Sequence, residues 1–414
     1  LIRISGPSSH ELVKKFSSKI TNKSNTSFFN KIKNNEGDTI DQTITTFYKS
    51  PKSFTGEDMV EIASHGSTAV TKEIIKIFIK KNDVRLANPG EFTRRAFENN
   101  KLDLTQVEAI ADIVNAETEM QRKQAIEHLS GNFFKYSKEI FENLKKILAN
   151  TEAIIDFSDE ELPEGLMSGI KEQIENNIKK INNTLKNSNK GISIRNGFII
   201  SVVGKPNTGK SSFVNNVSDK EVSIVTDQPG TTRDLIESFV DIGGYPIKFI
   251  DTAGIRKPNN MVEKIGIEKA HLVSKNADLN LVFIDKVTDI NIFLSLKKAI
   301  FVRSRQDVFG GPFVEKTHYN ISSKTNYGIN ELFEVIKEKI NKHQPNENIF
   351  ISRERHKKCL EKTVYCLESS KKEKNIDMFA EDIRLALKNF SNLFGNVDIE
   401  DILDIIFSDF CIGK

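Results

Sequence analysis

A glycine-rich segment near the middle of the chain has the residues of a phosphate-binding loop. It reads Gly204-Lys205-Pro206-Asn207-Thr208-Gly209-Lys210-Ser211-Ser212 and matches G-x-x-x-x-G-K-[ST] without a mismatch. The apolar run 198–203 before it predicts a buried strand, and residues 212–217 can open a helix. Glycines let consecutive N–H groups face phosphate oxygens, and the helix N-terminus adds partial positive charge. In such a loop Lys210 reaches the β- and γ-phosphates and Ser211 holds Mg²⁺.

Two later segments have the residues that a nucleotide site needs around its γ-phosphate. The first is Pro229-Gly230-Thr231-Thr232-Arg233-Asp234, where a threonine can sense the γ-phosphate by holding Mg²⁺. The second is Asp251-Thr252-Ala253-Gly254, where the aspartate can orient Mg²⁺ through water and Gly254 can offer its N–H. Each four-residue match is weak alone. In this order, and after these strands, they resemble the Ras-like GTPases of the translation-factor class.

The segment expected to recognise the base departs from the usual pattern. In Ras-like GTPases it is N-K-x-D, whose aspartate pairs with guanine N1–H and the exocyclic amine, and adenine lacks that donor pair. Here the stretch reads Ser304-Arg305-Gln306-Asp307, so Asp307 is present while serine and arginine replace asparagine and lysine. Both replacements are polar and could do similar work. Ser322-Ser323-Lys324 resembles the S-A-K element that contacts the base.

A second departure concerns the attacking water. Ras-type enzymes have a glutamine directly after D-T-A-G, whereas this chain has Ile255. An apolar side chain cannot orient water, so another group, or a partner, must do so.

Composition places few limits on the function. The chain of 414 residues is long enough for two or three domains, and a net charge of +3 neither implies nor excludes nucleic acid. The three cysteines (Cys359, Cys366 and Cys411) lack metal-ligand spacing and argue against a disulfide framework. No apolar run approaches a membrane span and no signal peptide is visible, so we expect a cytoplasmic protein. We also expect residues upstream of Leu1.

The first hundred residues predict a small α/β unit. Strands are expected at 1–4, at 41–48 and up to residue 62, and helices at 10–20, at 70–79 and from residue 89. Three acidic residues, Glu57, Asp58 and Glu61, crowd beside Gly56. Without further information the ordinary interpretation, a solvated turn with a helix or strand cap, is favoured over a binding site.

The rest of the chain predicts a sheet domain between two helical segments. A capping box is expected at Thr105-Gln106-Val107-Glu108, a break at 156–163 and a linker at 187–191. Residues 197–343 alternate strands and helices as in a doubly wound parallel sheet, with a two-residue hairpin at 242–245. Apolar residues at helical spacing predict two more helices near the end of the chain. One set is Ile383-Leu387-Phe390-Phe394, ended by Gly395, and the other is Ile399-Leu403-Ile406. One helical domain with the nucleotide domain inserted is the economical arrangement, since helix stripes need partners.

With these motifs in place, the whole chain resembles the MnmE (TrmE) family of tRNA-modifying GTPases. Besides the nucleotide motifs, the resemblance rests on Arg3-Ile4-Ser5-Gly6, Phe54-Thr55-Gly56-Glu57-Asp58, Pro89-Gly90-Glu91-Phe92-Thr93, Lys101-Leu102-Asp103-Leu104 and the terminal Phe410-Cys411-Ile412-Gly413-Lys414. It implies an α+β N-terminal domain (1–100) that binds tetrahydrofolate and dimerises. It further implies a discontinuous all-α domain (101–196 and 344–414) and an inserted Ras-like α/β G domain (197–343).

The resemblance also implies an activity and its partners. A homodimer of the family works with a flavoprotein that carries FAD, MnmG (GidA), in a heterotetramer. Together they add an aminomethyl or carboxymethylaminomethyl group to C5 of the wobble uridine of certain tRNAs. A tetrahydrofolate derivative, 5-formyl or 5,10-methylene, donates the one-carbon unit, and GTP hydrolysis is stimulated by K⁺.

Roles follow from the resemblance position by position. Family contacts to GTP fall on residues of the phosphate loop, the two later segments and the base elements: Asn207, Thr208, Gly209, Lys210, Ser211, Ser212, Thr226, Asp227, Gln228, Pro229, Gly230, Thr231, Thr232, Asp251, Thr252, Ala253, Gly254, Asp307, Ser322, Ser323 and Lys324. Ser211 and Thr232 match the Mg²⁺ ligands, and the K⁺ ligands match Asn207, Thr226, Gln228 and Thr231.

The remaining implied roles lie outside the phosphate and base elements. Glu263 matches the glutamate that orients the attacking water, and Cys411 matches a cysteine required for modification. With Lys210 they form the implied catalytic set. The folate-contacting positions match Arg3, Glu61, Lys101 and Lys414. The basic residues suit glutamyl carboxylates of the folate, and Glu61 suits donor groups of the pterin.

Two other hypotheses remain open from the residues. One is a GTP-gated binding switch, such as a ribosome-assembly GTPase, with weak hydrolysis; the folate motif and the terminal Cys-Ile-Gly-Lys argue against it. The other is a degenerate GTPase, motivated by Ser304-Arg305-Gln306-Asp307. Intact Lys210, Ser211, Thr232 and Asp251 argue against that one.

Overall fold

The computed structural model describes residues 1–18, 22–81, 83–156, 165–220, 239–251, 273–341 and 351–395. Predictions on 226–232, 252–254, Glu263, Cys411 and Lys414 therefore lie outside the described residues, as do the break at 157–163 and the stripe at 399–406. The chain divides into two compact units. One holds residues 1–114, 128–142 and those from 387 onward, and the other holds 115–127 and 143–386. Each unit is described by itself.

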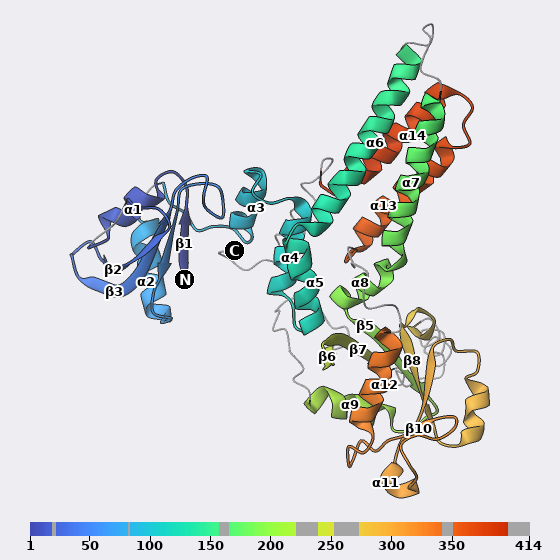
Figure 1. The fold of residues 1–414 in the computed structure, drawn as a ribbon. Coiled ribbons are helices and arrows are strands. Elements are labelled where there is room, and N and C mark those ends of the chain that lie inside the picture. Colours follow the sequence, from blue (N-terminus) through green and yellow to red (C-terminus); the bar gives the residue numbers. More distant parts are fainter. Residues whose placement is uncertain are drawn as a thin grey trace, which may run out of the picture. The chain divides into compact units, whose positions relative to one another are not determined.

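A four-stranded antiparallel sheet is the centre of the first unit (Figure 1). Its strands are β1 (Ile2–Ser5), β2 (Thr26–Lys33), β3 (Thr39–Tyr48) and β4 (Met59–Ala63), in the order β1-β4-β3-β2. Strand β2 was not predicted from the sequence. Helices α1 (Ser9–Lys15) and α2 (Thr68–Ile79) contribute Val13 and Ile74 to the core under this sheet. Because side chains alternate along strands, the opposite face carries Arg3 and Glu61, which lie opposite each other on β1 and β4.

The helices that follow include one correction to the sequence analysis. They are α3 (Glu91–Glu98), α4 (Leu104–Val114), α5 (Glu119–Leu129) and α6 (Asn132–Asp156). The capping box of α4 pairs Asp103 with Gln106, not Thr105 with Glu108. Asp103 Oδ1 accepts from Gln106 N (3.0 Å), and Gln106 Oε1 accepts from Asp103 N (3.1 Å). Thr105 and Glu108 already lie inside the helix and are buried, because that face packs inward.

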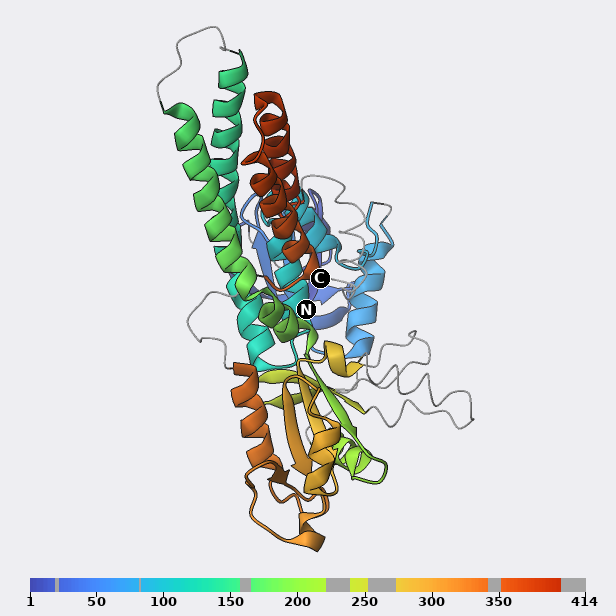
Figure 2. The same ribbon diagram turned by 90° about the vertical axis from the view of Figure 1, so that its right-hand side faces the viewer.

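The second unit contains a second set of helices: α7 (Leu166–Lys186), α8 (Ser188–Asn196), α13 (Glu354–Ser370) and the larger part of α14 (Ile376–Ser391). Helices α7 and α13 pack against each other (Figure 1), and Figure 2 shows the same helices turned by 90°. The linker expected at 187–191 is wrong, since α8 begins at Ser188. Burial of Ile192 and Ile194 stabilises this helix despite its polar first turn. Helix α14 ends at Ser391, a few residues before Gly395. Among the helices that the structure describes, none has the length and apolarity needed to cross a membrane.

The second unit also holds a six-stranded sheet. Its strands are β5 (Phe198–Gly204), β6 (Phe239–Ile242), β7 (Tyr245–Asp251), β8 (Leu279–Ile284), β9 (Ala299–Arg303) and β10 (Tyr319–Asn320), in the order β10-β9-β8-β5-β7-β6. Among the pairs of strands that the structure describes in this sheet, only β6–β7 is antiparallel. This is the expected Ras-like, doubly wound order. The predicted hairpin is confirmed, with φ of +60° at Gly243 and +89° at Gly244.

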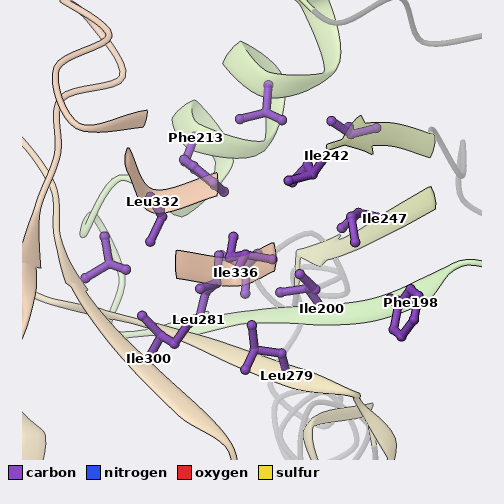
Figure 3. Close-up of a cluster of buried hydrophobic side chains, with 14 of the residues drawn as sticks. Phe198, Ile200, Phe213, Ile242, Ile247, Leu279, Leu281, Ile300, Leu332 and Ile336 are labelled. Atoms are coloured by element: carbon purple, nitrogen blue, oxygen red, sulfur yellow. The ribbon is translucent and has the colours of Figure 1, made fainter. Parts of the chain in front are cut away.

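Helices α9 (Lys210–Lys220) and α12 (Ile329–Asn341) pack on this sheet (Figure 3). Phe213 from α9 and Ile336 from α12 meet strand residues such as Ile200 and Leu281, all fully buried. The helix η1 (Val287–Ile292) and the short α11 (Gln306–Phe309) follow β8 and β9. Because parallel strands end at the same edge, the segments after β5, β7, β8, β9 and β10 gather there, which is where such sheets bind ligands.

The β6–β7 hairpin also contacts the first turn of α5, within the second unit. Met120 N donates to Gly244 O (3.0 Å), and the Met120 side chain packs against the core of the sheet. Gln121 Nε2 donates to Arg195 O (3.0 Å), which ties the same segment to the end of α8. The helical residues 115–127 and the sheet are therefore parts of one packed body.

Candidate functional site

The phosphate loop connects β5 to α9, as predicted. Gly204 has φ +147°, and a Cβ there would lie 2.2 Å from the Phe283 carbonyl oxygen, so only glycine fits. Lys210 Nζ donates to the carbonyl oxygens of Gly204 (3.0 Å) and Lys205 (2.6 Å). Thr208 Oγ1 also donates to Lys205 O, at 2.8 Å. The loop is therefore wrapped around the Lys210 ammonium.

The two predicted Mg²⁺-related residues inside the described part of the chain lie together. Ser211 Oγ, on the first turn of α9, donates to Asp251 Oδ2 at the end of β7 (2.7 Å). A hydroxyl and a carboxylate are hard oxygen donors of the kind that Mg²⁺ prefers, so the pair fits that ion. Thr232, the other predicted ligand, lies outside the described residues, as do all the predicted K⁺ ligands except Asn207. Asn207 is exposed at the loop, with φ +61°.

The base-recognition elements also meet. Ser322 Oγ donates to Asp307 Oδ1 (2.6 Å), and Gln306 N donates to Ile321 O (2.9 Å). Ser322 is fully buried, while Asp307 is exposed at the start of α11. Asn216 Nδ2 from α9 donates to Ser323 O (2.6 Å), and Lys324 is exposed beside it. The structure thus brings Asp307 and the 322–324 segment together at the sheet edge that carries the phosphate loop.

Two of the four predicted folate positions form an ion pair on the open face of the first sheet. Arg3 Nε donates to Glu61 Oε1 at 2.7 Å, and the Arg3 guanidinium lies over the Phe54 ring at 5.7 Å from its centroid. Tyr48 OH donates to Glu61 Oε2 (3.3 Å), and burial together with the Glu61 charge raises the Tyr48 pKa. Lys101 Nζ donates to Pro51 O (3.0 Å), and Lys414 lies outside the described residues.

The other acids of this region are not merely solvated. Glu57 Oε2 accepts from Ser5 Oγ (2.8 Å) and from Arg95 Nη1 (2.9 Å), while Asp58 Oδ1 accepts from Ser50 N (2.7 Å). The interpretation as a solvated turn is therefore wrong for Glu57 and Glu61, while Asp58 does cap a nearby backbone N–H within the turn. The Glu57 and Glu61 carboxylates accept from residues distant in the chain, which a one-dimensional pattern cannot show, whereas Asp58 accepts from Ser50 in the same segment.

Sequence analysis missed Tyr48 as the partner of Glu61 and Arg95 as the partner of Glu57. Tyr48 ends a strand that the alternation predicted, but only the β3–β4 pairing places it beside Glu61. Arg95 follows the predicted helix start at residue 89 by one to two turns, and nothing in its local pattern indicates Glu57. It also missed the hydrogen bond from Ser304 Oγ to Thr208 O, which joins the base and phosphate segments.

Comparison with known proteins agrees with this geometry along the whole chain. The model of the GTP-binding protein TrmE N-terminus matches residues 1–101, and the model of the MnmE helical domain matches residues 104–411. The curated tRNA modification GTPase MnmE of Pelagibacter ubique is 40% identical and that of Aquifex aeolicus 37% identical. The alignments cover 100% of this chain and 96% of each relative. The MnmE of Ehrlichia chaffeensis is 37% identical with the same coverage. The chain therefore belongs to the MnmE (TrmE) family of tRNA modification GTPases.

Proposed function

We propose that the chain is a K⁺-stimulated GTP hydrolase whose cycle drives modification of the wobble uridine of certain tRNAs. It acts in the cytoplasm as a homodimer with a flavoprotein partner that carries FAD, the MnmG (GidA) protein, in a heterotetramer. The group added at uridine C5 is aminomethyl or carboxymethylaminomethyl, and its one-carbon unit comes from a bound tetrahydrofolate derivative. The proposal rests mainly on the match of the chain to both family models. It is supported by the position of the phosphate loop and the base-recognition segments at one edge of the sheet.

The phosphate end of the site supports a hydrolase. Lys210 is placed at the loop to bind the β- and γ-phosphates, where its charge offsets the charge that develops during transfer. Ser211 and Thr232 are the proposed Mg²⁺ ligands, and Asp251, which accepts from Ser211, would orient the ion through water. The ion would supply charge neutralisation at the phosphate oxygens. Asn207, with Thr226, Gln228 and Thr231, is the proposed K⁺ set. Glu263 is the proposed orienter of the attacking water, since Ile255 cannot perform that role.

The base end supports guanine. A carboxylate at Asp307 accepts from both N1–H and the exocyclic amine, and the Ser322 hydroxyl fixes its orientation. An unpaired carboxylate facing adenine would be penalised by its lost hydrogen bonds.

The first sheet supports a folate site. Its open face combines an arginine, a half-buried phenol and a carboxylate beside the Phe54 ring, which suits a flat, polar pterin and an anionic glutamyl tail. Arg3, Glu61 and Lys101 are the proposed contacts, with Lys414. Cys411 is the proposed residue of the modification chemistry.

The test is GTP turnover by the whole protein in KCl and in NaCl at matched ionic strength. We expect clear stimulation by K⁺, and Asn207→Ala should abolish the difference between the salts. Adding the flavoprotein partner and an unmodified tRNA should then yield modified uridine only when GTP and folate are present. Slow turnover that is indifferent to the cation would instead favour the GTP-gated binding switch.

A further inference from the structure

The base-recognition segment is tied directly to the phosphate loop. Ser304 Oγ donates to the carbonyl oxygen of Thr208, and Ser304 is 5% exposed. A Cβ on Gly209 would lie only 2.5 Å from Ser304 Oγ, so the two segments are in close contact. The serine at this position therefore connects the end of β9 to the middle of the loop.

A second tie runs from the other side of the phosphate loop. Lys205 Nζ donates to Asp289 Oδ1 at 2.6 Å, and the Asp289 side chain is 7% exposed. Asp289 Oδ2 accepts from the backbone N–H groups of Asp285 (3.2 Å) and Lys286 (3.0 Å). The hydrogen bond from Lys205, followed by those from the backbone, lowers the pKa of Asp289 to about 2. The Lys205 ammonium thus already has an anionic partner within its own domain.

A third contact joins the base-recognition segment to the segment that holds Asp289. Arg305 Nη2 donates to Asp285 Oδ1 at 2.9 Å, and Arg305 is the chain neighbour of Ser304. The Arg305 backbone has φ +63°, and its guanidinium also lies 5.4 Å from the centroid of the Phe309 ring. These contacts therefore form a continuous chain of hydrogen bonds. Lys205 contacts Asp289, Asp289 accepts from Asp285 N, and Asp285 accepts from Arg305. Ser304, next to Arg305, then contacts Thr208 in the phosphate loop.

We propose that the segment 285–289 and Ser304 form a brace that fixes the spacing between the phosphate loop and the base-recognition segment. Asp289 and Ser304 are then positioning residues for guanine nucleotides, and Lys205 anchors the loop to the brace instead of binding phosphate. This inference rests on the proposed function, because it requires the site to bind GTP and GDP.

The physical reason is the length of the nucleotide. Guanine and the phosphates are joined by one ribose, so a nucleotide gains from both contacts only when the protein presents the two ends at the correct spacing. A preorganised site avoids the entropic cost of ordering its loops on binding. The brace also explains how a serine and an arginine can stand where the related GTPases have asparagine and lysine. Ser304 is short enough to fit against Gly209, and Arg305 reaches Asp285.

The test is a double-mutant cycle read by titration of GDP and GTP into the whole protein. The variants are Lys205→Met, Asp289→Asn and the double variant, with Glu334→Gln as control, because Glu334 forms an exposed ion pair with Lys337 on α12. If Lys205 and Asp289 act through each other, each single variant weakens nucleotide binding by roughly tenfold, as expected for one charge-assisted hydrogen bond. The double variant should then be no weaker than either single one.

The alternative, that Lys205 binds phosphate directly, gives a different pattern. Lys205→Met would then lose more affinity than Asp289→Asn, and the two losses would add; that result would overturn the brace. Ser304→Ala should raise KM for GTP by a similar factor with kcat within about twofold, and Ser304→Thr should restore part of the affinity. Affinity equal to wild type in both Asp289→Asn and Ser304→Ala would also overturn it. Titration of the unaltered protein separates the two proposals. If it binds neither GDP nor GTP, the proposed function fails; if it binds both but the variants bind equally well, only the brace fails.

Discussion

The Ser322 hydroxyl donates a 2.6 Å hydrogen bond to the Asp307 carboxylate, although Asp307 lies in α11 after β9 and Ser322 follows β10. One carboxylate oxygen is thereby oriented by a fully buried donor, and the exposed position of Asp307 leaves its carboxylate at the edge where the phosphate loop lies. The hydrogen bond fixes the orientation of the aspartate proposed to bind guanine, at a segment where Ser304 and Arg305 differ from the usual residues.

The first prediction concerns this pair. Asp307→Asn should shift the preference from GTP towards xanthosine triphosphate, because an amide can donate to the xanthine carbonyl where a carboxylate cannot. Turnover with both nucleotides is the measurement, and Glu334→Gln on α12, which removes an exposed ion pair with Lys337, serves as the control. An unchanged preference would remove Asp307 from base recognition.

The second prediction concerns the water-orienting role. Glu263→Ala should leave GTP affinity intact and slow hydrolysis by roughly 10²–10⁴-fold, the range for losing general-base assistance. Single-turnover hydrolysis beside equilibrium nucleotide binding separates the two effects. Turnover equal to that of the unaltered protein would show that a different group orients the water.

The third prediction concerns the Ser211–Asp251 pair. Ser211→Ala should weaken GTP binding in the presence of Mg²⁺ and leave binding in the presence of a chelator nearly unchanged, because only the metal-dependent share of affinity passes through the hydroxyl. Titrations with and without Mg²⁺ measure both. Equal losses in the two conditions would mean that the hydroxyl supports the loop structurally.

The fourth prediction concerns the open face of the first sheet. Glu61→Gln should weaken binding of 5-formyltetrahydrofolate by at least roughly tenfold, since it removes the charge that organises both Arg3 and Tyr48. Isothermal titration measures the affinity. Glu73→Gln on α2, whose partner is Lys76 at 3.1 Å, is the control and should bind normally. Equal affinity in both variants would locate the folate elsewhere.

The fifth prediction concerns acid stability of the first unit. Hydrogen bonds from Arg85, aided by those from Asn88 and Arg95, lower the pKa of Glu91 from 4.5 to about 2. Because the pKa is lower in the folded state, ionised Glu91 stabilises α3 fully above pH 4.5, and this stabilisation is lost as the pH falls towards 2.

Amide exchange of residues 91–98 at several pH values tests this. Glu91→Gln should increase exchange relative to wild type at pH 6, and the difference should shrink as the pH is lowered below 4.5. Glu98→Gln, which removes the more exposed pair with Arg94, is the control and should change exchange little at either pH. A difference for Glu91→Gln that does not depend on pH would contradict the assigned pKa.

The parts of the fold that could be predicted from the sequence are those determined by a few adjacent residues. The phosphate loop, the 242–245 hairpin and the buried run of β8 each follow from a few adjacent residues, and each is present in the structure. The polar start of α8 was taken for a linker because burial of Ile192 and Ile194 depends on packing partners distant in the chain. The same limit explains why Tyr48 and the Ser304–Thr208 hydrogen bond were missed. The Asp103–Gln106 cap is local, but the Thr105–Glu108 pattern two residues later fits the same motif, and only the burial of Thr105 and Glu108 distinguishes the two.

The contact between Met120 and the β6–β7 hairpin has a consequence for the autonomy of the sheet. A fragment limited to residues 197–343 would lose the Met120 side chain from its core and the Met120 N–H from the Gly244 carbonyl. Water would then reach an apolar surface next to Tyr245, at the opposite end of the strand that carries Asp251. The isolated fragment should therefore be less stable than the same residues within the whole chain, and a fragment that begins at residue 115 should recover the difference.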